Sequence, residues 1–383
     1  MGKKRYFLVI LPLLLAIWLV ANLELGGRVL GGQEEEREGE LLASRKQNYQ
    51  RWFERLQEQT EVIETFAVKD LNAVPVKYWE EIGGPAAYIR LTGYEMTDAI
   101  VMEIPPKGSL KRHRHIYEEN ILVLSGQGYT ELQQKDRRSQ RIQWQKRSYF
   151  VPPLNSWHQH FNTGSTPARL LAVTAGPLMV NIFGDRQLSY SLDYALRDRY
   201  DAEEDFARVN DRIVGRFYKR NFVEDVLDVF MPSWEYRGRG NRTVEWVMGS
   251  NNMTYTHMSE FPIGMYKKAH RHWGEAILYI VTGKGYTLIW EEGKFNERQR
   301  ANWQANSLIG VPPGVWYHQH FNTGREPARY IAFRGARGLP GRTADSRVIQ
   351  IEHEDESPLI REEYMKEIAR EGIEFKMRDI FEK

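Results

Sequence analysis

The sequence contains no cysteine, and this absence excludes disulfide bonds, thiolate metal sites and a cysteine nucleophile. A strong charge imbalance is also missing, because 53 basic residues face 51 acidic ones and the formal net charge is +2. We find no basic patch interleaved with aromatic residues, so we expect no nucleic-acid partner. Apolar residues are not scarce: they make up 42% of the 383 residues, which predicts folded domains with sizeable cores.

An apolar run at the N-terminus extends from Phe7 to Ala21, directly after Lys3, Lys4 and Arg5. It is long for a signal-peptide core and short for a spanning helix of about 20 residues. The basic residues before the run and an acidic stretch after it predict that the bulk of the chain lies on the extracytoplasmic side of the membrane. We expect residues 1–45 to be an uncleaved signal anchor and an acidic linker, with a cleaved signal peptide as the alternative.

Three further segments have the features of helices. A helical arm is predicted over 46–84, because four large side chains share one helix face: Tyr49, Trp52, Phe53 and Leu56. Long charged and aromatic runs predict a helical connection over 185–235. A C-terminal extension, 341–383, contains a helix that starts at Ser357 and Pro358, ends near Gly372 and docks by a stripe of Ile360, Tyr364 and Ile368.

Between these segments lie two regions of short β-type runs broken by Gly, Pro and Asn, at 85–184 and 236–340. They are copies of one unit. HRHIYEENILVLSGQGYTEL begins at His113 and HRHWGEAILYIVTGKGYTLI begins at His270, while the heptad HQHFNTG occurs at both 158–164 and 318–324. The chain therefore holds a duplicated β domain.

Eight of the ten histidines lie in these repeated blocks. On a strand, the residues of an H-x-H pair point to the same face, so two imidazoles with a third from another strand form a set of nitrogen donors. Imidazole suits iron, manganese, nickel, copper or zinc. The pattern predicts one metal site in each copy.

Both copies resemble cupin domains, and the whole chain resembles a bicupin. The family's two motifs match in order in each copy, and the matching residues are Gly108, His113, His115, Glu119, Gly126, Pro153, His158 and Asn162, then Gly264, His270, His272, Gly283, Pro313, His318 and Asn322. The resemblance implies a mainly β fold of two double-stranded β-helix or jelly-roll barrels, here with a helical N-terminal arm, connecting helices and a C-terminal helix.

The two copies differ at one ligand position. The resemblance implies a three-His-one-Glu metal set in the first copy, made of His113, His115, Glu119 and His158. In the second copy Ala276 replaces the glutamate. Glu275 precedes it by one residue, and a shift of one residue on a strand turns a side chain to the opposite face, so we expect no ligand there. The second copy keeps His270, His272 and His318, a set that resembles that of gentisate-type dioxygenases.

His160 and His320 stand two residues after the last histidine ligand of each copy, so they point the same way, into the barrel. Three interpretations remain open: an alternative metal ligand, an acid–base imidazole beside the metal, or a core residue bonded to backbone. We take the acid–base interpretation as the working one and name both as candidate catalytic residues.

The resemblance and the donor sets together support three hypotheses. The first is an Fe(II) dioxygenase that acts on a small hydroxylated aromatic or carboxylic acid in the second copy, with Arg271 and Arg334 as candidate substrate anchors. The second is an Mn(II) enzyme like oxalate decarboxylase or oxalate oxidase. The third is an exported, non-enzymatic metal- or ligand-binding protein. Barrel edges and extra helices also suggest a homodimer.

Overall fold

The computed structural model divides the chain into two compact units, Met1–Trp52 and Phe53–Lys383. The apolar run at 7–21 lies outside the residues that the structure describes. Within the described residues, no helix is both long and apolar enough to cross a bilayer. The structure describes residues 37, 48–91, 93–197, 205–207, 212–248, 253–335 and 349–382.

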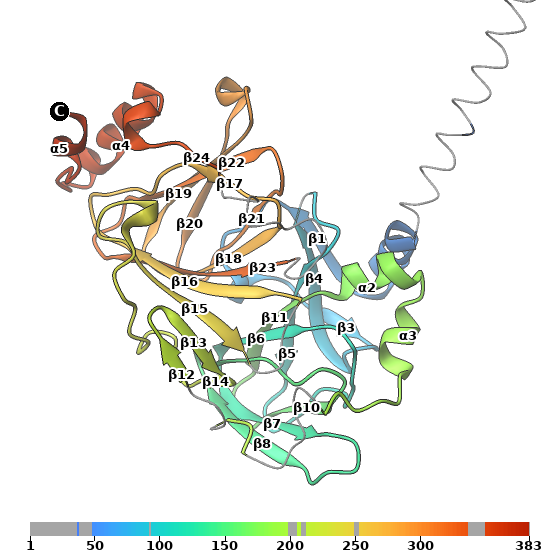
Figure 1. Ribbon diagram of the computed structural model, residues 1–383. Coiled ribbons are helices and arrows are strands. Elements are labelled where there is room, and N and C mark those ends of the chain that lie inside the picture. The colour runs from blue at the N-terminus through green and yellow to red at the C-terminus, as the bar shows by residue number, and fades with distance from the viewer. Residues whose placement is uncertain are drawn as a thin grey trace, which may run out of the picture. The chain divides into compact units, whose positions relative to one another are not determined.

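The first copy forms a barrel of two sheets, called barrel one (Figure 1). The larger sheet has the order β1-β4-β5-β11-β6-β9-β14, with β3 paired to β4, and the smaller has the order β10-β7-β8. The strands are β1 (Glu61–Thr65), β3 (Lys77–Trp79), β4 (Gly84–Leu91), β5 (Asp98–Ile104), β6 (Glu119–Ser125), β7 (Gln127–Gln133), β8 (Gln140–Gln145), β9 (Tyr149–Phe150), β10 (Trp157–Asn162), β11 (Ala168–Thr174) and β14 (Phe222–Val223).

The second copy repeats this order and is called barrel two. Its larger sheet runs β12-β13-β15-β16-β23-β18-β21-β2, and its smaller sheet runs β20-β19-β22-β17-β24. The strands are β2 (Ala67–Val68), β12 (Arg212–Val214), β13 (Phe217–Arg220), β15 (Arg242–Met248), β16 (Tyr255–Phe261), β17 (His270–Arg271), β18 (Ala276–Thr282), β19 (Lys284–Glu291), β20 (Gln299–Gln304), β21 (Leu308–Val311), β22 (Trp316–Asn322), β23 (Ala328–Arg334) and β24 (Ile349–Gln350).

The larger sheets of the two barrels share one apolar core. It joins residues of β4, β5, β6 and β11, such as Val101 and Leu171, to residues of β15, β16, β18 and β23, such as Trp246 and Phe333. Each barrel also takes a strand from the segment that precedes the other: β2 pairs with β21, and β14 pairs with β9. The predicted mainly β fold of two jelly-roll barrels is confirmed, and the barrels form one body rather than two independent domains.

The helical arm is shorter than predicted. Residues 48–59 are helical, and Phe53 and Leu56 of the predicted face are buried, with the ring of Phe53 lying 6.0 Å from that of Tyr88. From Glu61 the chain is extended, because the stretch EVIETFAV is rich in β-branched residues that favour strands. Residues 61–79 therefore contribute strands β1, β2 and β3, with a single 3-10 turn at Leu71–Ala73, rather than a continuation of the α-helix.

Among the described residues of the predicted connection over 185–235, only those at its start form an α-helix. Helices α2 (Gly176–Phe183) and α3 (Arg186–Ser191) follow barrel one, but residues 212–223 form β12, β13 and β14. Gly215, whose φ of 58° lies in the left-handed region, makes the turn between β12 and β13. Tyr218 is buried between two exposed neighbours, a period of two that the helical prediction overlooked.

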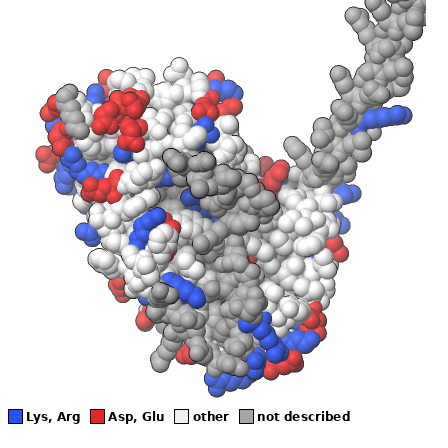
Figure 2. All heavy atoms as spheres, viewed as in Figure 1, with Lys and Arg blue, Asp and Glu red and all other residues white. Residues whose placement is uncertain are grey.

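The C-terminal helix α4 (Pro358–Arg370) docks on the smaller sheet of barrel two, and α5 (Arg378–Phe381) follows it. The predicted stripe of Ile360, Tyr364 and Ile368 is buried, and the Tyr364 hydroxyl donates to the carbonyls of Met265 and Asn322 at 3.0 and 2.7 Å. On the face shown in Figure 2, acidic and basic side chains are interspersed, and acidic ones gather at the upper left, where Figure 1 shows α4.

Candidate metal centres

Barrel one brings together the four predicted ligands His113, His115, Glu119 and His158. Their donor atoms all lie within 4.8 Å of one another. His113 faces His158 across an isolated antiparallel bridge, and Glu119 opens strand β6 beside them. The two-residue spacing of His113 and His115 puts both rings on the same side, with 5.5 Å between their centroids.

The three imidazoles of barrel one have their tautomers set by the backbone. Each Nδ1 lies within hydrogen-bond distance of a carbonyl oxygen: His113 at 2.9 Å, His115 at 2.8 Å and His158 at 3.0 Å. A carbonyl can only accept, so each Nδ1 carries the proton and each Nε2 keeps a lone pair for a metal. This donor set fits a divalent transition metal ion.

Glu119 completes this set as a carboxylate. Burial alone would raise its pKa, but the neighbouring rings of His115 and His158 hold the pKa of Glu119 well below its usual range. Its Oε2 lies 3.4 Å from His115 Nε2 and 3.2 Å from His158 Nε2. A charged oxygen and three nitrogen lone pairs therefore converge on one point.

Barrel two brings together His270, His272 and His318, again with donor atoms within 4.8 Å. The ring centroids of His270 and His318 are 4.1 Å apart and those of His272 and His318 are 4.9 Å apart. The matching distances in barrel one are 4.2 and 5.0 Å. The carbonyls of Lys268 and Gly274 fix the Nδ1 protons of His270 and His272. The two sets thus have closely similar distances from the third histidine to the other two.

The carboxylate position differs between the barrels. Ala276 occupies it in barrel two and lines a cavity there. Glu275 takes no part in the cluster, as expected. Its carboxylate lies in barrel one instead, where it accepts hydrogen bonds from the backbone amides of residues 95–97 and from the Thr97 hydroxyl. The centre in barrel two is therefore a set of three neutral nitrogen donors.

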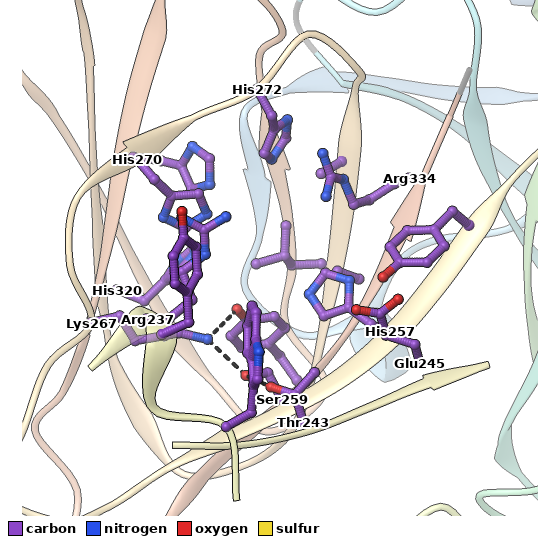
Figure 3. Close-up of a pocket in the computed structure, with 18 of the residues that line it drawn as sticks. Arg237, Thr243, Glu245, His257, Ser259, Lys267, His270, His272, His320 and Arg334 are labelled. Atoms are coloured by element: carbon purple, nitrogen blue, oxygen red, sulfur yellow. Dashed lines mark hydrogen bonds between the residues drawn. The ribbon is translucent and has the colours of Figure 1, made fainter. Parts of the chain in front are cut away.

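The cavity of about 210 Å³ in barrel two opens onto this centre (Figure 3). In Figure 3, His270, His320, Lys267 and Arg237 lie on one side, Arg334, His257 and Glu245 lie on the other, and His272 is at the top. The Lys267 ammonium is held at the floor, 2.7 Å from the Ser259 hydroxyl and 2.7 Å from the Tyr330 hydroxyl. Strands β16 and β23 supply six of the lining residues: Tyr255, His257, Ser259, Tyr330, Ala332 and Arg334.

Positive charge dominates this cavity. Arg216, Arg237, Lys267 and Arg334 line it, and Glu245, the one carboxylate among the lining residues, already forms an ion pair with Arg216. Burial lowers the pKa of Arg237 to about 10, and burial and the nearby Arg237 lower the pKa of Lys267 well below its ordinary value. Such crowding of buried cations is unfavourable unless an anion shares the space.

Burial also lowers the pKa of the histidines around the cavity. The positive charge of Arg237 lowers the pKa of His270 further, and that of Arg334 lowers the pKa values of His272 and His257 further. All three rings are consequently neutral near pH 7, as metal ligation by His270 and His272 requires.

The interior of barrel one is built differently at the equivalent positions. Ser259 pairs with Tyr330 across β16 and β23, and the matching pair in β5 and β11 is Met102 with Leu170. The amides of Lys267 and Leu110 make the same hydrogen bond, to the carbonyls of His320 and His160. Polar or charged residues in barrel two thus correspond to buried apolar ones in barrel one, namely Ile100, Met102, Leu110 and Leu170.

The two candidate catalytic histidines are both buried. His320 lines the cavity, its ring 5.4 Å from that of His318. His160 lies 5.8 Å from His158 and 6.3 Å from Phe150 between ring centroids. The Nδ1 atom of each ring lies beside a threonine hydroxyl instead of a backbone carbonyl. His160 Nδ1 lies 2.7 Å from the Thr130 hydroxyl, and His320 Nδ1 lies 2.8 Å from the Thr287 hydroxyl.

The two candidate substrate anchors differ in their position relative to the cavity. Arg334 lines the cavity, but Arg271 does not: it pairs with Glu292 at 3.0 Å and lies over the ring of Tyr317. Arg271 lies away from the cavity because neighbours on an extended segment point to opposite sides, and His270 and His272 take the inner one. Arg237, Lys267 and His257 were missed. An alignment of the two copies by strand position would have revealed Lys267 and His257, because both align with apolar residues of the first copy.

Comparisons with known proteins give one family match and a group of similar solved structures. Residues 100–174 match the family model described as Cupin domain. No curated protein matches the chain. Similar solved structures include a point mutant of Bacillus subtilis oxalate decarboxylase OxdC, which is 14% identical over 73% of this chain and 80% of that one, with a TM-score of 0.49. Another, from a study of its Mn(II) centres, is 14% identical over the same shares, with a TM-score of 0.48.

The family assignment rests on the domain match and on the internal duplication. The matched segment contains the four ligands of barrel one and its strands from β6 to β11, and barrel two repeats these motifs and this strand order. Barrel one therefore matches a cupin domain, and the chain has a bicupin fold with a candidate metal centre in each barrel.

Proposed function

We propose that barrel two is the reaction centre of a metal-dependent enzyme that converts a small carboxylic acid with two negative charges, and that the metal of barrel one is structural. The observation that carries this proposal is the placement of Arg237, Lys267 and Arg334 around the same cavity as the three histidine ligands. These cations favour an anion, and their number favours one with more than a single charge.

The residues of the cavity have separable roles in such a reaction. His270, His272 and His318 would hold a divalent metal, which would supply Lewis-acid polarisation of an acid oxygen. The guanidinium groups of Arg237 and Arg334 bind and orient carboxylates, and Arg groups do so in a bidentate manner. Lys267 provides a compact charge at the floor, fixed by Ser259 and Tyr330. Burial strengthens each of these interactions.

Barrel one lacks the equivalents of these polar cavity residues. The positions that carry Lys267, Ser259, Tyr330 and His257 in barrel two hold apolar side chains there, and Glu119 occupies a ligand position that Ala276 leaves open. A closed, four-ligand set of this kind suits a metal that stabilises the fold. We therefore keep the interpretation that the second copy carries the chemistry.

Two reactions fit this site, and the charge of the cavity favours the first. The first is cleavage or oxidation of a dicarboxylate of the oxalate class, with Mn(II) or Fe(II) as the metal. The second is oxygen-dependent cleavage of a hydroxylated aromatic acid, for which the three neutral histidines would hold Fe(II). A cavity of about 210 Å³ has room for either a dicarboxylate or a single aromatic ring.

The test is to load the purified protein with Mn(II) or Fe(II) anaerobically and to supply oxalate, longer dicarboxylates and dihydroxybenzoates. Carbon dioxide release and oxygen uptake are then followed together. We expect turnover of a dicarboxylate. Oxygen uptake with a dihydroxybenzoate alone supports the second reaction, and tight binding of an acid without turnover supports an exported binding protein. A metal-loaded protein that neither binds nor converts any of these acids contradicts the proposal.

We also propose that the barrels lie on the extracytoplasmic side, anchored by residues 7–21. The support is the basic flank of the apolar run and the acidic stretch that follows it. Mass spectrometry of the protein purified from its own membranes decides between an intact N-terminus, which we expect, and a cleaved one. Recovery of intact protein from the cytoplasm contradicts the proposal.

A further inference from the structure

His320 ends a hydrogen-bond chain that starts at a tryptophan. The indole Nε1 of Trp303 lies 3.0 Å from the Thr287 hydroxyl oxygen, which lies 2.8 Å from His320 Nδ1. Trp303, Thr287 and His320 are all buried. Barrel one repeats the chain with Trp144, Thr130 and His160, at 3.1 and 2.7 Å.

The chain determines which nitrogen of His320 carries the proton. An indole N–H can only donate, so the Thr287 oxygen accepts from Trp303. Within the described part of the chain, the only acceptor for the Thr287 proton is His320 Nδ1. A neutral His320 therefore keeps its own proton on Nε2.

This tautomer is the opposite of the one that the metal ligands adopt. His270 and His272 donate from Nδ1 to carbonyls and keep a lone pair on Nε2, whereas His320 offers an Nε2–H group. A protonated ring nitrogen does not bind a metal. His320 lines the cavity beside Lys267 and Arg237, where a donor complements an anion.

We propose that His320 is a fixed hydrogen-bond donor, whose Nε2–H, oriented by Thr287 and Trp303, binds the carboxylate of the anion in the cavity of barrel two. This role excludes metal ligation by His320 and replaces general-base catalysis with anion binding. It rests on the proposed function for the identity of the anion. Thr287 and Trp303 are positioning residues, since neither lines the cavity.

The first test is the tautomer itself. Protein labelled with ¹⁵N in histidine and loaded with Zn(II) gives distinct signals for protonated, unprotonated and metal-bound ring nitrogens, and the His320→Ala variant identifies the His320 pair by difference. We expect protonated Nε2 and unprotonated Nδ1 for His320. A proton on Nδ1, or zinc on Nε2, overturns the proposal whether or not the protein binds a dicarboxylate.

The second test is the affinity for oxalate, measured by calorimetry on the Zn(II) protein. Thr287→Val removes the hydroxyl with little change of volume, and Thr130→Val makes the same change in barrel one. Loss of a hydrogen bond to a charged group weakens binding about tenfold or more. We expect this loss for Thr287→Val and for His320→Ala, near-normal affinity for His320→Gln, which keeps an N–H donor, and no change for Thr130→Val.

The outcomes separate the two proposals. If the wild type binds no oxalate, the substrate class of the proposed function fails, while the ¹⁵N spectrum still decides the tautomer. If the wild type binds oxalate and His320→Ala binds it equally well, the role of His320 fails while the function stands. Equal losses in Thr287→Val and Thr130→Val contradict the proposal as well, because they indicate a general loss of structure.

Discussion

Glu118 and Glu275 occupy the same position in the two barrels, and each carboxylate is bound by a loop of the other barrel. Glu118 accepts hydrogen bonds of 2.6 Å from the amides of Met253 and Thr254 and from the Thr254 hydroxyl. Glu275 accepts from the amides of residues 95–97 and from the Thr97 hydroxyl. The residue next to the ligand position therefore joins the barrels instead of binding metal.

Glu118→Gln and Glu275→Gln are each expected to destabilise the protein by about 2–4 kcal/mol. The side-chain amide keeps the volume, but it removes the charge and one of the oxygens that accept from the loop, so at least one buried N–H loses its partner. Urea unfolding measures the change. Glu292→Gln is the control, because it removes an exposed partner of Arg271 and should cost less than about 1 kcal/mol. Equal midpoints for all three variants contradict this account.

Ala276→Glu should convert the centre of barrel two into a copy of the one in barrel one. The new carboxylate stands where Glu119 stands, so metal retention against a chelator should rise. It also occupies an open ligand position and partly neutralises the cavity cations, so oxalate affinity should fall at least about tenfold. Chelator competition and calorimetry measure the two effects. Increased oxalate affinity would show that the cavity does not bind anions as we describe.

Lys267→Met should weaken oxalate binding about 10- to 100-fold, because it removes one of the cavity cations without a large change of volume. The salt dependence of binding should fall with it. Lys294→Met is the matched control, since Lys294 is exposed and pairs with Glu291 at 2.7 Å. Unchanged affinity in Lys267→Met would remove Lys267 from the anion site.

Asp98 should give the protein a recognisable dependence of stability on pH. Burial raises the pKa of Asp98 from its ordinary value of 3.8 to about 6. Between these values the folded chain keeps a proton that the unfolded chain has released, so the free energy of unfolding falls as pH rises through this window. Relative to the wild type, Asp98→Asn should gain about 3 kcal/mol between about pH 4 and pH 7. Urea unfolding at several pH values measures the difference in free energy of unfolding between the two proteins. A difference that stays constant across this range would refute the raised pKa of Asp98.

The sequence predicts the barrels and the ligand sets well because both depend on local spacing. An H-x-H pair on extended backbone fixes two rings on one side, and repetition of the motifs identifies the duplication. The same alternation predicts that Glu275 turns away from the metal. Applied to Arg271, it would have corrected the anchor prediction, which considered residue type without the direction of the side chain.

The anion site was harder to predict because its residues come from separate elements. Arg237 precedes β15, Lys267 precedes β17, and His257 and Arg334 lie on neighbouring strands, so no short motif contains them. The strand exchange by β2 and β14 depends on pairing between distant segments, which periodicity does not specify. Gly215 and the alternation around Tyr218 were local signals for strands within the segment predicted as helix.

The central claim is that barrel two carries the reaction while the metal of barrel one is structural. Its most direct test compares His270→Ala with His113→Ala in metal content and acid turnover. Each variant removes one ligand from one of the two clusters. We predict that each loses about one metal ion per chain, that His270→Ala also loses dicarboxylate binding and turnover, and that His113→Ala keeps both while becoming less stable. Loss of turnover in His113→Ala, with full activity in His270→Ala, would contradict the account.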